Sequence, residues 1–243
     1  QGTLDKICSV DLNLDGPAAV CVILSNDGTP VSMKFIHRSE GLDDRRKRLL
    51  GIVATKRSQT GIIAENEQDN ARTWQKIQDL DDNEAHRISR RIVDFATRHQ
   101  AKVIIFEHLS NLIPIKGKYS VKSNNKRTYW LKGRIAEYTK YKAWHASMIV
   151  SRINPKDTSR LCPGCHKEVA RYNAGEAPVG YQPGASLMLC PSCLVRGNAD
   201  RSAAINVGHK FLNRYYPGQF WPTREKPRSI EETNLLNDIN FYV

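Results

Sequence analysis

The sequence has no apolar run approaching the roughly 20 residues that a membrane-spanning helix requires. It has no charged-then-apolar segment at its start, so we expect no secretory leader. Acidic residues are few relative to basic ones, 25 against 37, which gives a formal net charge of +12. This excess predicts a polyanionic partner, with nucleic acid as the first candidate and an anionic membrane surface as the second.

The sequence also lacks an initial methionine and any internal repeat. We therefore expect it to be part of a longer protein. Its 243 residues suit one large domain, or a core with a small inserted module. Long disorder is not expected, because apolar segments recur along most of the chain.

Cysteine is scarce, and four of the six cysteines form two C-x-x-C pairs, Cys162/Cys165 and Cys190/Cys193. Such pairs form a four-thiolate zinc site more often than two disulfides, which are the alternative. Four sulfurs fill the coordination of zinc, so the site should be structural, in a reducing compartment. His166 beside it is expected to be a solvated loop residue. Cys8 and Cys21, in apolar strand-like runs, are expected to be small buried hydrophobes.

The hydrophobic pattern predicts a mixed α/β domain. We expect an antiparallel meander of strands at 6–12, 18–25 and 31–37, a buried strand at 102–107 and a last strand at 148–153. Helices are expected from about 43, over 70–98, over 130–146 and over 201–212, with residues 116–128 as a loop and a tail after 213 packed on the surface. The acidic stretch 81–83 could split the second helix into two.

Three acids stand out. Asp11 and Glu107 each end an apolar strand, which is where ligand sites of α/β sheets lie. Burying Glu107 after four apolar residues costs several kcal/mol unless it is paired or binds a cation. Asp200, where a helix begins, would alone be interpreted as an N-cap, and Asp11 alone as a turn residue. Brought together, the three would repel one another, and two Mg²⁺ ions about 4 Å apart would remove that penalty and suit phosphodiester hydrolysis.

Four segments carry a resemblance to a known family: SVDLNLDGPAAVCVI, VIIFEHLSNL, the cysteine-bearing NPKDTSRLCPGC with CPSC, and NADRSAAINV. In this order they resemble the RuvC nuclease domain of the TnpB and type V CRISPR effector family, over residues 6–212. The sequence departs from the family at Asn13, where glycine is usual, and at Ser202, where asparagine is usual.

The resemblance implies an RNase H-like (RuvC) α/β fold, a mixed sheet with flanking helices and an inserted zinc ribbon. It implies that Asp11, Glu107 and Asp200 bind catalytic Mg²⁺ or Mn²⁺. The expected divisions are a core at 1–155 with a basic helical insertion at about 41–98, a zinc ribbon of the target-strand-loading type at 156–197, and a third motif with closing helix and tail at 198–243.

The resemblance further implies that the parent protein is an RNA-guided nuclease of the prokaryotic cytoplasm, acting at the nucleoid, with guide RNA, target DNA and upstream lobes of the same polypeptide as partners. A silent DNA-holding domain of a targeting or CRISPR-associated transposition complex, with transposition proteins as partners, is the second hypothesis. A zinc-ribbon nucleic-acid binder with unrelated acids is the third.

Basic residues are concentrated in two segments, 45–57 and 116–142, and the second holds nine Lys or Arg against one acid, Glu137. Aromatic residues are interleaved in it; most are expected to pack inward, although they could stack on bases. A solvated surface is the alternative interpretation for the basic residues. The residues expected to contact nucleic acid are Arg45, Arg46, Arg48, Lys122, Lys126, Arg127 and, beside a scissile phosphate, Arg196.

Overall fold

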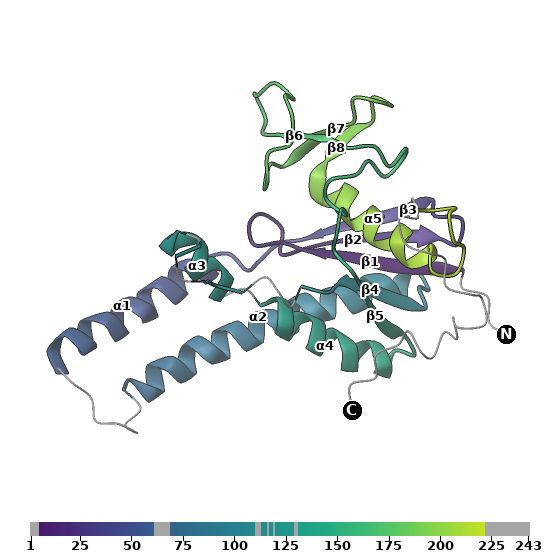
Figure 1. Cartoon of the computed structure of the whole chain (residues 1–243). Helices are drawn as coiled ribbons and strands as arrows, with labels where there is room; N and C mark the ends of the chain where they lie inside the picture. Colours follow the sequence, from purple (N-terminus) through teal and green to yellow (C-terminus); the bar gives the residue numbers. More distant parts are fainter. Residues whose placement is uncertain are drawn as a thin grey trace.

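The structure of the chain, a computed structural model, describes residues 5–60, 69–109, 113–115, 117–118, 120–128 and 131–221. A central sheet carries helices on both faces, a helical hairpin extends to one side, and a small second sheet stands above the first (Figure 1). Within these ranges, no helix has the length and apolar character needed to cross a bilayer.

The central sheet has five strands in the order β3-β2-β1-β4-β5. Its antiparallel half is the predicted meander, and β4 and β5 extend it in parallel from β1. Each strand lies within one residue of its predicted ends. The bounds are β1 Lys6–Leu12, β2 Ala19–Ser25, β3 Pro30–Ile36, β4 Val103–Glu107 and β5 Ile149–Ile153.

Opposite faces of the sheet form separate cores because side chains alternate along each strand. Cys8 and Val10 point to the face covered by α2 (Ala71–Arg98) and α4 (Lys132–His145). Ile7 and Leu24 point to the face covered by α5 (Ala199–Leu212). This mixed sheet between helices is an RNase H-like fold, and the expected burial of Cys8 and Cys21 is confirmed.

The helical hairpin consists of α1 (Leu42–Thr60) and α2, which lie side by side (Figure 1). The guanidinium group of Arg46 donates to Asp81 and Asp43, and both Arg46 and Asp81 are buried. Asp82 accepts a hydrogen bond from Tyr138 of α4 at 2.8 Å. The acidic stretch therefore holds the helices together, and α2 runs unbroken where the sequence allowed a division.

One prediction of irregular structure is wrong: part of the loop expected over 116–128 is a helix, α3 (Val121–Thr128). The sequence did not predict this helix because its Lys, Ser and Asn residues provide no apolar stripe. The hydroxyl of Ser120 accepts a hydrogen bond from the N–H of Ser123 at 3.2 Å, a bond that stabilises a helix start. Asn124 ties the helix to the backbone of Ile115 through its side-chain amide, at 3.0 and 3.1 Å.

The inserted sheet lies between β5 and α5 in the sequence. It is antiparallel, with β6 (Ala170–Tyr172), β7 (Leu187–Leu189) and β8 (Arg196–Asn198) in that order. After α5, the expected packing of the tail is seen for Phe220, whose ring contacts His209 with centroids 6.2 Å apart. Residues 222–243 lie outside the described part of the chain.

Helix α5 approaches the central sheet closely at Gly208. A Cβ atom there would lie 2.1 Å from Cδ1 of Leu24 and 3.2 Å from Oγ of Ser9. Leu24 and Ser9 are fully buried, so neither has room to move away. Gly51 in α1 is the opposite case, because no heavy atom lies within 4 Å of its Cβ position.

We expect Gly208→Ala to lower the free energy of unfolding by about 1–3 kcal/mol, since overpacking outweighs the gain in helix propensity. The matched variant Gly51→Ala should raise it by up to about 1 kcal/mol. Denaturant unfolding of both variants measures the difference. Equal stabilisation by the two alanines would contradict the close packing of α5.

Candidate metal centres

Two of the three acids meet through the pairing of β1 with β4. These strands are parallel, with Val10 opposite Phe106, so the next residues, Asp11 and Glu107, are neighbours at the carboxyl ends. Asp11 follows Ile7 in alternation, and Glu107 follows Ile105, two residues of the core on the α5 side. Both carboxyl groups therefore point toward α5.

The third acid, Asp200, lies in the first turn of α5. It is not the N-cap that it would be if interpreted alone, because Asn198 takes that position and accepts a hydrogen bond from the N–H of Arg201 at 2.9 Å. A carboxylate in a first turn also interacts favourably with the helix dipole.

The charges of Glu107 and Asp200 act on Asp11. The pKa of Asp11 lies well above its ordinary value, first because of burial and then because of the charges of Glu107 and Asp200. Burial also raises the pKa values of Glu107 and Asp200. Carboxylates are the donors that a hard divalent cation prefers, so the chemistry of the three residues suits Mg²⁺ or Mn²⁺. Among the described residues, the four cysteines are the group whose ligand atoms already lie close enough to share one ion.

Arg171 is the residue of this centre that the sequence did not reveal. It lies on β6 of the inserted sheet, is buried, and donates from Nε and Nη2 to the carbonyl oxygen of Ala185 at 3.0 and 2.6 Å. Its Nη2 lies 3.8 Å from Oδ1 of Asp200, and its charge lowers the pKa values of Asp11 and Asp200. In the sequence, the one feature that sets Arg171 apart is that it is a basic residue flanked by the apolar Val169 and Ala170 and by Tyr172.

The two departures from the family pattern have different surroundings. The Asn13 side chain lies beside Asp11 and lowers its pKa, so it belongs to the centre. The Ser202 hydroxyl donates to the carbonyl oxygen of Asn198 at 3.0 Å and stays within its own helix. Of the two departures, only Asn13 affects the pKa of an acid of the site, Asp11.

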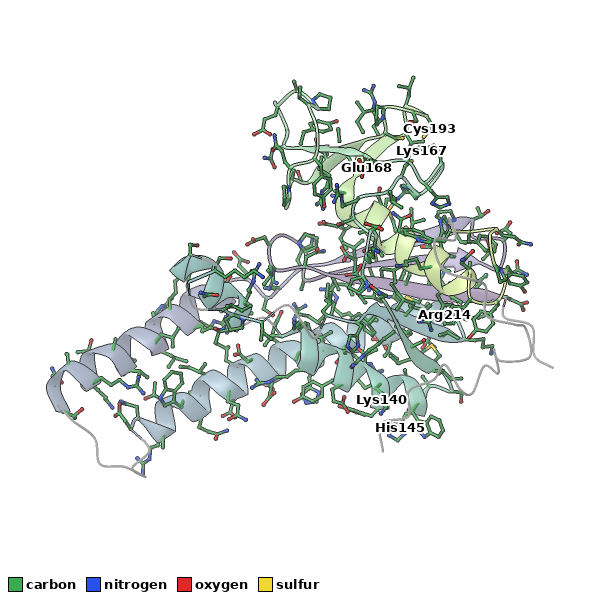
Figure 2. The ribbon with its side chains drawn as sticks, in the orientation of Figure 1. Lys140, His145, Lys167, Glu168, Cys193 and Arg214 are labelled. Carbon is green, nitrogen blue, oxygen red and sulfur yellow. The ribbon has the colours of Figure 1, made fainter. Side chains whose placement is uncertain are left out.

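The four paired cysteines converge at one point of the inserted module, whose outer side Figure 2 marks with Cys193. Their sulfur atoms lie within 4.8 Å of one another. The Cys162–Cys193 and Cys165–Cys190 sulfur separations are 3.5 Å, far beyond the roughly 2.05 Å of a disulfide. Four thiols at this spacing fit one tetrahedral zinc ion and exclude the disulfide alternative.

The two C-x-x-C turns have the same backbone geometry. His166 and Leu194, which follow the second cysteine of each pair, have φ values of 55° and 61°. Their N–H groups donate to the carbonyl oxygens of Cys162 and Cys190 at 2.9 Å. The prediction of a solvated His166 is wrong, because the ring is half-buried, 5.4 Å from the Trp221 ring and 6.1 Å from that of His209.

For one of the basic residues expected to contact nucleic acid, Arg46, the prediction is wrong. Its charge is buried and paired with Asp81, so no phosphate can reach it. Arg45, Arg48 and Arg196 are exposed, and Arg127 is half-buried with Nη1 3.2 Å from the Ser123 hydroxyl. The side chains of Lys122 and Lys126 lie outside the described part of the chain, and for the remaining residues nucleic-acid contact stays a prediction.

The aromatic residues interleaved with the basic residues of 116–142 differ in their exposure. Tyr138 is half-buried and stacks on His86, with ring centroids 3.9 Å apart. Tyr141 of the same helix is 44% exposed, against the expectation of inward packing. Tyr119, Tyr129 and Trp130 lie outside the described residues.

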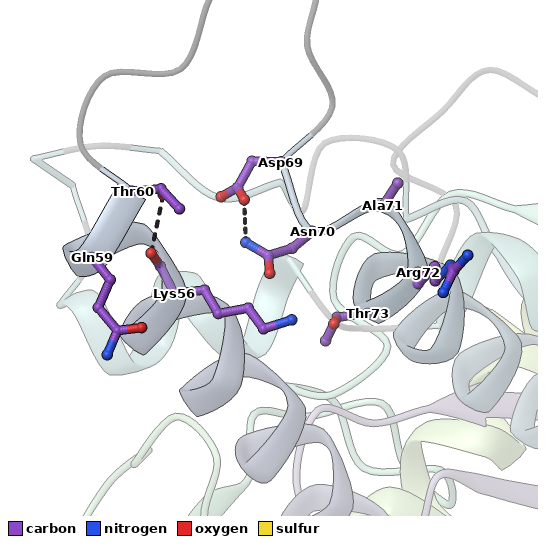
Figure 3. A pocket seen from close by; sticks show the side chains of 8 residues that line it. All are labelled: Lys56, Gln59, Thr60, Asp69, Asn70, Ala71, Arg72 and Thr73. Carbon is purple, nitrogen blue, oxygen red and sulfur yellow. Dashed lines mark hydrogen bonds between the residues drawn. The ribbon is translucent and has the colours of Figure 1, made fainter.

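A hollow of about 490 Å³ lies between the end of α1 and the start of α2 (Figure 3). It is at the outer end of the hairpin, away from both metal centres, and its polar groups already bond locally, as Thr60 does to the carbonyl oxygen of Lys56. We therefore assign the hollow no part in the acid centre, the name used here for Asp11, Glu107 and Asp200. The lining residues are Lys56, Gln59, Thr60, Asp69, Asn70, Ala71, Arg72 and Thr73.

Comparisons with known proteins agree with this architecture. Residues 133–207 match the family model "Cas12f1-like, TNB domain". A TnpB-like protein of Aquifex aeolicus is 28% identical over 87% of this chain and 69% of its own length. The CRISPR-associated endodeoxyribonuclease Cas12f1 of Sulfoacidibacillus thermotolerans is 32% identical over 54% of this chain and 28% of its own.

Among solved structures, a Cas12f1–sgRNA–target DNA complex matches 85% of this chain with a TM-score of 0.61 and 17% identity. A CRISPR-Cas12f ternary complex matches 83% with a TM-score of 0.58 and 18% identity. The chain spans 50% and 38% of those two chains. At such identities the likeness concerns the fold.

The fold and its inserted four-cysteine module define a RuvC-like domain of the RNase H-like class. Together with the curated relatives, they confirm the resemblance to the RuvC domain of the TnpB and type V CRISPR effector family.

For the cysteine centre, we expect the purified chain to carry about one Zn²⁺, lost in Cys162→Ser and in Cys190→Ser. Elemental analysis by mass spectrometry measures it. Cys21→Ala, which removes a buried thiol outside the ribbon, should keep the metal. A well-folded wild-type chain without zinc would contradict this site.

For the acid centre, burial that raises the pKa of Asp11 makes its ionised form costly to the fold. The stability contributed by the neutral carboxyl is present below the unfolded pKa, near 4, and is lost as pH rises through the folded value. Without divalent ions, Asp11→Asn should therefore be more stable than wild type at about pH 7 and nearly equal to it near pH 4.

Thermal unfolding measured over this pH range checks this expectation. Millimolar Mg²⁺ should raise the midpoint of the wild type and leave Asp11→Asn unchanged, because ligand binding to the native state stabilises it. Asp79→Asn, an exposed acid of α2, is the control. A variant less stable than wild type at every pH would refute the burial argument.

Proposed function

We propose that this chain is the nuclease portion of an RNA-guided effector and that it hydrolyses DNA phosphodiester bonds with two Mg²⁺ or Mn²⁺ ions. The observation that supports the proposal is the place of Asp11 and Glu107 at the carboxyl ends of two buried parallel strands, where the charges of Glu107 and Asp200 raise the pKa of Asp11. If the three acids merely ended separate turns, Glu107 and Asp200 would not raise the pKa of Asp11.

Each residue of the centre has a role that follows from its surroundings. Asp11, Glu107 and Asp200 hold the ions, which when bound supply an activated water and stabilise the leaving oxygen. Arg171 offsets part of the acidic charge from the ribbon side and has its guanidinium group fixed by Ala185. The sheet beneath excludes water, since Val10 and Ile105 are fully buried.

The partners proposed for the complete protein are guide RNA and target DNA. The matched Cas12f1 structure is a complex with sgRNA and target DNA. The net charge of +12 and the exposed Arg45, Arg48 and Arg196 support a polyanion on this chain too. The proposal includes three units, 1–155, 156–197 and 198–243, with structural zinc in the second.

A catalytically silent DNA-holding domain is the second candidate. The observation that favours it is Asn13, whose side chain lies beside Asp11 where the family usually has glycine. In this candidate the acids remain, but the added amide displaces one ion or the phosphate, and the domain serves a targeting or transposition complex.

Cleavage by the complete natural protein with its guide RNA and Mg²⁺ or Mn²⁺ decides between them. We expect the isosteric variants Asp11→Asn, Glu107→Gln and Asp200→Asn each to lower the cleavage rate by more than about a hundredfold, beyond the usual cost of losing an outer-shell partner of a metal ligand. The control Asp79→Asn should cut as wild type does.

Cutting at the same rate by all variants would contradict the acid centre. Absence of cutting by the wild type, with target binding retained, would support the silent domain instead. In that case Asn13→Gly tests whether the family's glycine restores cleavage.

A further inference from the structure

Side chains from one stripe of α5 and the turn after it hold the segment that leads from β5 into the zinc ribbon. The stripe is Asn206, Lys210 and Arg214, spaced four residues apart, and we name these three residues the α5 clamp. Residues 152–161 are the lead segment. Figure 2 labels Arg214, the last residue of the clamp.

The clamp binds five carbonyl groups of the lead segment. Asn206 Nδ2 donates to the carbonyl oxygens of Thr158 and Leu161, both at 2.7 Å. Lys210 Nζ donates to those of Asn154 and Lys156, both at 2.9 Å. Arg214 Nη2 completes the set with the carbonyl oxygen of Arg152 at 3.0 Å.

These bonds fix an irregular backbone. Beyond Ile153 the lead segment is in no strand or helix, and the carbonyl groups that its own turns do not bond need partners from elsewhere. Asn206 is fully buried, and two clamp residues are cations, whose hydrogen bonds to carbonyls are stronger than neutral ones. The lead segment is therefore tied to α5 and the turn after it by five hydrogen bonds.

The fixed segment presents Thr158 to the acid centre. Its Oγ1 lies 2.5 Å from Oε1 of Glu107, the length of a charge-assisted bond to a carboxylate. The same hydroxyl lies 2.8 Å from the carbonyl oxygen of Pro155, and its single proton serves one acceptor at a time. Donation to Glu107 holds one carboxylate oxygen and so orients the plane of the group.

The clamp also reaches the zinc centre. Leu161, whose carbonyl oxygen Asn206 binds, directly precedes Cys162, the first cysteine of the ribbon. Buried Asn206 thus touches both the residue that holds Glu107 and the residue that leads into the zinc site.

We propose that Thr158 and Asn206 are positioning residues: Asn206 fixes the lead segment, and Thr158 orients Glu107 for divalent-metal binding, so that the ribbon supports the acid centre. The inference rests on the proposed function for the identity of the metal site. The outer-shell partners of metal ligands typically contribute 10–100-fold to metal affinity.

The test is a titration of the complete protein with Mn²⁺, followed by electron paramagnetic resonance, with zinc content measured alongside. Thr158→Val, which keeps the shape and removes the hydroxyl, should weaken Mn²⁺ binding about 10–100-fold. Thr158→Ser, which keeps the hydroxyl, should restore binding close to wild type. Ser159→Ala is the matched control, because the Ser159 hydroxyl lies 3.0 Å from the Tyr181 hydroxyl and not at Glu107.

Asn206 is tested through its dependence on Thr158. Asn206→Ala should weaken Mn²⁺ binding in the wild-type background and add little in the Thr158→Val background, because both changes break the same chain of contacts. Lys210→Met offers a second route to loosening the clamp should Asn206→Ala not fold. All variants that fold should keep about one zinc ion.

Two results would overturn the inference on its own. One is Mn²⁺ binding by Thr158→Val equal to wild type while Glu107→Gln binds weakly. The other is full additivity of the Asn206 and Thr158 changes. Failure of the wild type itself to bind Mn²⁺ would overturn the acid centre and with it the proposed function, which distinguishes the two failures.

Discussion

The parallel pairing of β1 with β4 decides where the acids of this domain can lie. Once Val10 faces Phe106 across the two strands, Asp11 and Glu107 must be neighbours on the same side of the sheet. The buried strands beneath them leave these carboxyl groups little water, and their pKa values rise. The cost of this arrangement to the fold is the physical reason to expect cations at the site.

Helix α5 connects this edge to the rest of the molecule. Its first turn carries Asp200, its middle approaches the sheet at Gly208, and its clamp residues hold the segment that leads to the ribbon. The ribbon in turn contributes Arg171, whose charge opposes that of the acids. An insertion that could have been a separate zinc module therefore takes part in the acid centre.

The sequence was sufficient for the parts governed by local pattern. The strand ends and the convergence of the four C-x-x-C cysteines follow from apolar alternation and residue type, and the same reasoning predicts a site at the three acids. It was insufficient where a partner distant in the sequence decides: Arg46 belongs to a run of basic residues but is buried against Asp81, 35 positions away. Arg171 was missed for the same reason. Helix α3 was missed because its capping by Ser120 has no hydrophobic signature.

A crystal structure of the complete protein with Mn²⁺, using anomalous scattering to locate the ions, tests the central claim most directly. The account predicts manganese bound among the carboxylates of Asp11, Glu107 and Asp200, with a second ion about 4 Å from the first when a DNA phosphate is present. Zinc should be found separately among the four ribbon cysteines. Manganese absent from the three acids, at saturating concentration and with all three carboxyl groups ordered, would contradict the account.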